Sequence, residues 1–111
     1  NYFIQIERNG KKELEKIIED LGQLKDDFSE LSTRIEDIKS EIESVKDEEE
    51  EAYDNLPEVF QEGEKGERMQ SAMDSMETAV DTLDEMADDI ERLSGDSIDD
   101  AIESIREAID A

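Results

Sequence analysis

Carboxylates are the only chemically reactive side chains that this chain carries in quantity, and six of them are regularly spaced. They follow an alternation of three and four residues, at heptad positions b and e, which places them along one face of a helix with one charge about every 5 Å. We call this set the carboxylate ridge: Asp74, Glu77, Asp81, Asp84, Asp88 and Glu91. A straight line of negative charge resembles a nucleic-acid backbone, so it predicts binding to a basic protein surface.

Two interpretations of the carboxylate ridge follow from its surroundings. In the first, it occupies the basic channel of a DNA- or RNA-binding protein, because B-DNA shows one phosphate per about 3.4 Å along each strand, a spacing of the same order. In the second, the acids are only the solvated face of a coiled coil, and lysines of a preceding helix neutralise the members at position e. The sequence leaves both interpretations open.

Catalytic machinery is nearly absent from the sequence. The chain has no His and no Cys, and its Tyr and Ser residues have no base at motif spacing. Acid–base or nucleophilic catalysis would therefore depend on carboxylates alone. These lie on solvated helix faces rather than in an enclosed pocket, where catalytic acids are usually found. We expect a protein that is not an enzyme and has no cofactor.

No motif for binding a metal or a phosphate is complete. Asp96-x-x-Asp99-Asp100 lacks the alternating ligands of a calcium loop and has Ala101 where that loop needs Gly. It is more typical of a helix cap, Asp96, followed by acids that favour the start of a helix. Gly63-x-x-Gly66 lacks the Lys-Ser/Thr pair of a phosphate loop. We expect no metal site.

The overall charge excludes several classes of partner. The 111 residues include 36 acids against 12 bases, for a net charge of -24, and no cysteine. Direct binding to nucleic acid or to an anionic membrane is disfavoured, because both are negative. No apolar run approaches the roughly 18 residues of a membrane span. The expected partner is a basic surface, most simply that of a nucleic-acid-binding protein.

The stretch from Leu14 to Leu56 predicts a long coiled-coil helix over residues 11–52. Apolar residues alternate at intervals of three and four through five heptads, a pattern that is typical of a coiled-coil seam. Position a holds Leu14, Leu21, Phe28, Ile35 and Ile42, and position d holds Ile17, Leu24, Leu31, Ile38 and Val45. Such a seam needs a partner helix.

The rest of the chain supplies that partner. Pro57 ends the first helix, and residues 53–66 form a connector in which Leu56, Val59 and Phe60 predict a short helical turn that caps the bundle, with Gly63 and Gly66 turning the chain back. A second helix is expected over 67–93 and a short third one over 97–110, after a left-handed cap at Gly95. The third helix continues the second end to end or folds back on it.

The second helix has an apolar stripe wider than one neighbour requires. Position g is apolar in addition to a and d, so we expect a second contact, most simply with another copy of the chain in a homodimer. The stripe for a dimer or another partner consists of Ala72, Met73, Ala79, Met86 and Leu93. A variant interpretation is that its methionines grip a helix of another protein.

These patterns predict an all-α protein: a long antiparallel coiled-coil helical hairpin with a short third C-terminal helix, in one helical domain over 11–111. In an antiparallel pair, position e faces position e, so Lys25, Lys39 and Lys46 meet acids of the second helix. Residues 1–10 fall outside the heptads. With the Asn9-Gly10 breaker, they predict a strand or an extended arm, or a remnant of processing or cloning.

The run Glu48-Glu49-Glu50-Glu51-Ala52-Tyr53-Asp54-Asn55-Leu56-Pro57-Glu58, followed by Glu64-Lys65-Gly66-Glu67 and an acidic helix rich in Ala, Met and Leu, resembles a group of short acidic helical proteins. Phages and mobile elements of Gram-positive bacteria encode that group, and its activity is unassigned. The resemblance covers residues 11–111 and implies a small protein of the bacterial cytoplasm. The expected function is a nucleic-acid mimic that inhibits a host or defence nuclease. The alternative is a structural or adaptor coiled coil, such as a virion assembly component.

Overall fold

The computed structural model describes residues 2–111, with side chains from residue 10 onward, and every element in this range is helical. The all-α prediction is confirmed for these residues. The elements in chain order are α1 (Tyr2–Asp54), α2 (Glu58–Gln61), α3 (Glu64–Arg92), the π-helical segment η1 (Leu93–Ser97) and α4 (Ile98–Asp110).

The helix α1 begins at Tyr2, not at Lys11. The expected strand or extended arm before residue 11 is therefore wrong for residues 2–10, and Asn1 lies outside the described residues. The Asn9-Gly10 dipeptide does not break the helix, since α1 continues through both residues. No glycine in the described chain has a positive φ. Gly inside a helix costs only about 1 kcal/mol relative to Ala, which a long helix tolerates without ending.

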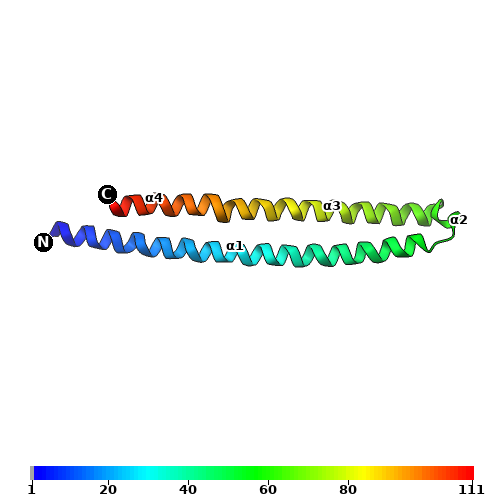
Figure 1. Cartoon of the computed structure of the whole chain (residues 1–111), viewed down its shortest axis with the longest axis horizontal. Helices are drawn as coiled ribbons and strands as arrows, with labels where there is room; N and C mark the ends of the chain where they lie inside the picture. Colours follow the sequence, from blue (N-terminus) through cyan, green and yellow to red (C-terminus); the bar gives the residue numbers. More distant parts are fainter. Residues whose placement is uncertain (1) are drawn as a thin grey trace. The chain divides into compact units, whose positions relative to one another are not determined.

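The connector contains the short helical turn that the sequence predicts, because α2 includes Val59 and Phe60. Figure 1 shows α2 between the end of α1 and the start of α3. The side chain of Gln61 donates a hydrogen bond of 2.9 Å from Nε2 to the carbonyl of Tyr53, which joins α2 to the last turn of α1. The capping role is wrong, however: Val59 and Phe60 are 75% and 54% exposed.

Gly66 lies in the first turn of α3, where it is buried, rather than in a loop. A Cβ atom at this position would lie 1.9 Å from the carbonyl oxygen of Gln61. The residue therefore permits a close backbone approach and does not supply a reversed turn conformation.

The chain forms two compact units. Unit 1 comprises Asn1–Ser32 and Asp89–Ala111, and unit 2 comprises Thr33–Asp88. In unit 2, Ile35 of α1 and Met73 of α3 are buried, with 7% and 8% of their surface exposed. Lys39 pairs with Asp84 at 2.7 Å and Lys46 with Glu77 at 3.6 Å. Partners on α3 move back by one heptad as α1 advances by one, so the two segments of this unit run in opposite directions.

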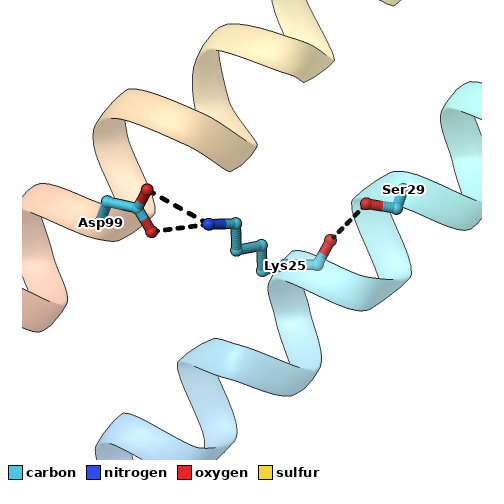
Figure 2. A network of polar contacts seen from close by, with 3 residues as sticks. All are labelled: Lys25, Ser29 and Asp99. Atoms are coloured by element: carbon cyan, nitrogen blue, oxygen red, sulfur yellow. Dashed lines mark hydrogen bonds and ion pairs between the residues drawn. The ribbon is translucent and has the colours of Figure 1, made fainter.

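In unit 1, Ile98 of α4 is buried, with 6% of its surface exposed. Lys25 of α1 forms an ion pair of 2.8 Å with Asp99 of α4, and Figure 2 shows its side chain extending from one helix to the other. The third helix therefore lies alongside α1 within this unit.

The expected helix end at Ser94-Gly95 is wrong. The backbone stays helical from Arg92 through Ile98, with no left-handed cap at Gly95, and Ser97 makes no side-chain capping hydrogen bond at the start of α4. The segment η1 forms a π turn, which carries one residue more than an α turn. Within unit 1, α4 therefore continues the helical backbone of the preceding residues and does not fold back on them.

The predicted a/d seam of α1 is rotated in both units. Along residues 14–53, the partly or fully buried residues occupy positions a and e, apart from Gly22 at position b, whereas position d stays half-exposed. We call these d residues the apolar row: Ile17, Leu24, Leu31, Ile38 and Val45, with exposed fractions of 43%, 42%, 43%, 45% and 53%. The lysines at position e, Lys25, Lys39 and Lys46, are partly buried, and their amines lie at acids of the facing segments.

Candidate protein-binding surfaces

The carboxylate ridge lies on α3, where all six of its members are exposed. Five members belong to unit 2 and Glu91 belongs to unit 1. The two members at position e of unit 2, Glu77 and Asp84, pair with Lys46 and Lys39. These two carboxylates are therefore neutralised within their own unit.

Lys39 is the most enclosed cation of these pairs, with 19% of its side chain exposed. Hydrogen bonds to the carboxylates of Asp84 and, next, Glu36 raise the pKa of Lys39 above its ordinary value of 10.5. The ammonium is held in its charged form between acids of both helices, so the e side of unit 2 is an internal contact more than a free surface.

The remaining ridge members of unit 2, Asp74, Asp81 and Asp88, are at position b. They are exposed, and no cation of the described residues pairs with them. Successive members are seven residues apart, or about 10 Å along a helix. This spacing is about three times that of phosphates along one DNA strand. The unpaired ridge is thus sparser than the sequence predicted.

Acids of α1 that the sequence analysis did not single out border the same side of unit 2. Two shallow hollows there each contain Lys46 and Glu77. One is completed by Glu43, Asp47, Val80 and Asp81, and the other by Glu50, Tyr53, Asp54, Gln70, Met73 and Asp74. Acids outnumber the single lysine in both. The sequence already contained a sign of this, because position b of the first helix carries Glu43 and Glu50. Antiparallel pairing brings position b of the first helix beside position b of the second.

Glu91 faces a different environment in unit 1. It lines an open hollow of about 400 Å³ with Phe28, Ser29, Ser32, Ile90, Ser94 and Gly95. Ser32 occupies position e, where the neighbouring heptads of α1 carry lysine, so a short side chain leaves the space unfilled.

The predicted dimer or partner stripe divides between the interior and the surface. Met73 is buried in unit 2, and Ala79 is half-buried. Ala72 is exposed, as are Met86 and Leu93, which are 44% and 46% exposed. Only the g residues of this stripe are thus accessible.

The exposed g residues and the apolar row lie on a common side within each unit. The ion pairs join position e to position e, so the two g positions share the opposite side, and position d of α1 neighbours its own g position. The register of the ion pairs puts Met86 level with the part of α1 near Ile38 in unit 2, and Leu93 level with Leu31 in unit 1. The other row residues lie further along α1.

Comparison with known proteins finds no relative of this chain. No family model matches the chain, and no curated protein or solved structure matches it either. The resemblance to short acidic phage proteins and the cytoplasmic location stay predictions.

Two features are absent from the part of the chain that the structure describes. Among these residues, no group of three or more acidic, His or Cys side chains could hold a metal ion. Within the same range, no helix is long and apolar enough to cross a membrane.

Proposed function

We propose that this chain is a non-enzymatic structural or adaptor protein: an antiparallel coiled-coil hairpin that binds a partner through the apolar row of α1. The observation that carries the proposal is the rotation of α1, which turns positions a and e inward and leaves position d half-exposed in both units. Soluble chains rarely keep a regular row of Ile, Leu and Val on the surface unless it is an interaction site.

The energetics support the same proposal. Complete burial of an Ile, Leu or Val side chain contributes about 1.5–3 kcal/mol, and each row residue has gained only part of this. The buried core is small, because Ile35, Met73 and Ile98 are its only buried large apolar side chains among residues 10–111. A partner that covers the row would add to a modest folded-state stability.

The test is retention of proteins from a bacterial lysate by the immobilised chain. The variant Leu24→Gln/Ile38→Gln removes two row residues, and Val59→Gln/Phe60→Gln is the matched control, because it removes exposed apolar side chains outside the row. We expect a protein that the wild type and the control retain at about 1 M salt, where the Debye length is about 3 Å, and that the row variant loses. Equal retention by all three would reject the proposal.

Nucleic-acid mimicry remains a second candidate because of the acidic hollows of unit 2, where acids of both helices surround Lys46. In that case, binding to a basic DNA-binding protein weakens steeply with salt and competes with DNA. The variant Asp74→Asn/Asp81→Asn/Asp88→Asn should no longer inhibit DNA binding by that protein and should keep its own helicity. The matched control Asp37→Asn/Glu41→Gln/Glu48→Gln removes equal charge elsewhere. If both triple variants inhibit equally, the ridge is only a solvated face.

A further inference from the structure

The apolar row has a uniform acidic border in unit 1. Ile17, Leu24 and Leu31 are each about two-fifths exposed. Position g, the outer neighbour of position d, carries Glu13, Asp20 and Asp27 in these heptads, and all three are exposed. In unit 2 the same border includes Arg34, so it is mixed.

The cation at the centre of unit 1 is directed away from this border. Lys25 occupies position e, and its amine makes contacts of 2.8 and 3.1 Å with the two carboxylate oxygens of Asp99 (Figure 2). Position c, which lies beyond this acidic border, carries Lys16, Gln23 and Glu30, and the charges of these three residues cancel. A partner on the apolar row therefore meets carboxylates along one edge.

A second copy of the chain fits this surface poorly. Antiparallel packing of α1 on α1 through position d would bring each g row against the other, acid facing acid. The two copies would also each carry a net charge of -24. Like charges at an interface border suppress association, so the homodimer expected from the sequence is disfavoured at this face.

We propose that the apolar row of unit 1 binds an amphipathic helix of another protein, whose apolar face is bordered by Lys or Arg. This inference rests on the proposed adaptor function and names the chemistry of the partner. From Ile17 to Leu31 the row spans about 21 Å, which matches about four turns of a partner helix. Apolar side chains bury the row, and the basic border pairs with Glu13, Asp20 and Asp27.

The probe is a synthetic three-heptad helical peptide with Leu at a and d and Lys at e and g. Its controls are the same peptide with Glu in place of Lys and a scrambled Lys peptide that has no apolar face. Binding to the full chain is measured by fluorescence anisotropy. We expect the Lys peptide to bind at least about tenfold more tightly than either control.

Variants of the chain locate the site. Leu24→Gln, alone and with Ile17→Gln and Leu31→Gln, should weaken binding of the Lys peptide at least about tenfold in the triple variant. The matched control Ile38→Gln/Val45→Gln in unit 2 should change it by less than about threefold. Circular dichroism checks the helicity of each variant, and the single Leu24→Gln variant keeps the test valid if the triple variant unfolds. Replacing Glu13, Asp20 and Asp27 by amides should weaken binding and reduce its salt dependence.

Three outcomes would overturn the inference. They are equal binding of the Lys and Glu peptides, undiminished binding of the Lys peptide by the unit 1 variants, and a mass of two protomers by light scattering with no peptide bound. A different result is that the row variant loses a lysate protein that the Lys peptide does not displace from the wild type. That result would support the adaptor function and reject only the basic helix as the partner. Undiminished binding by every row variant would reject both.

Discussion

Gly66 is the residue whose size matters most to the turn in unit 2. Its position is fixed by Gln61, whose side chain donates to the carbonyl of Tyr53 and whose own carbonyl group lies against Gly66. Any Cβ atom at residue 66 would have to displace backbone atoms, which cannot rotate away as a side chain does.

We therefore predict that Gly66→Ala destabilises the chain by about 1–3 kcal/mol, the range for overpacking of a closed site. The matched control is Gly22→Ala, since nothing lies within 4 Å of a Cβ atom at that position. It should stabilise the chain by about 0.4–1 kcal/mol, because Ala restricts the unfolded chain. Urea unfolding followed by circular dichroism measures both. A shift of the two variants in the same direction would contradict this account.

Lys39 gives the fold a dependence on alkaline pH. Its pKa is raised above 10.5 in the folded chain by hydrogen bonds to Asp84 and Glu36. A folded-state pKa above the unfolded one means that the ion pair stabilises the fold fully below about pH 10.5 and that this contribution is lost as the pH rises further.

Lys39→Met should therefore show a smaller loss of stability above about pH 10 than the wild type does, because the titrating group is gone. Lys12→Met is the matched control, since Lys12 is an exposed residue at position f. Melting temperatures measured from neutral pH to about pH 11 give the comparison. Identical alkaline curves for the wild type and Lys39→Met would show that the pair contributes nothing.

At the scale of the elements, the π segment η1 explains how α4 keeps its register with α1. Asp84 and Asp99 are fifteen residues apart, whereas their partners Lys39 and Lys25 are fourteen apart. The extra residue interrupts the heptads of α3, whose d positions end at Ile90 and resume at Ile98. A π turn absorbs one residue without ending the helix.

Deletion of Gly95 should convert η1 into a regular α-helical turn and preserve the contact between Lys25 and Asp99, because it restores the heptad spacing. We expect unchanged helicity and a melting temperature at least as high as that of the wild type. Deletion of Ser75 is the matched control: it removes one residue where the heptads are regular and should lower the melting temperature. Equal destabilisation by both deletions would contradict the register argument.

The spacing of Ile90 and Ile98 was visible in the sequence, but Ser94-Gly95 has the composition of a helix end, and the local signal favoured a cap. The second and third helices, the Pro57 boundary and the e pairs of Lys39 and Lys46 were predictable, because they depend on periodicity and charge. Lys25 was expected to meet an acid of the second helix, but it pairs with Asp99 of α4. The rotation of α1 was not. Lysine stems and apolar side chains compete for the same interface, and the heptad pattern does not determine which row turns inward.

For the whole molecule, the large negative charge and the small core both limit the stability of the folded chain. A net charge of -24 opposes compaction, and no large side chain among residues 10–111 is completely buried. The sequence predicted a candidate site on the acidic face of the second helix. Two of those acids are paired internally, and the more distinctive surface is the apolar row of α1, which was expected to be the closed part of the seam.

The central claim is that the apolar row is open in the free chain. Because the chain contains no cysteine, Ile38→Cys and Ile35→Cys introduce single thiols three residues apart, at positions that are 45% and 7% exposed. The measurement is the rate of alkylation by iodoacetamide in buffer, relative to the rate in urea. We predict that Ile38→Cys reacts nearly as fast as in urea and at least about tenfold faster than Ile35→Cys. Equal protection of the two thiols would show that the row is already covered and would contradict the account.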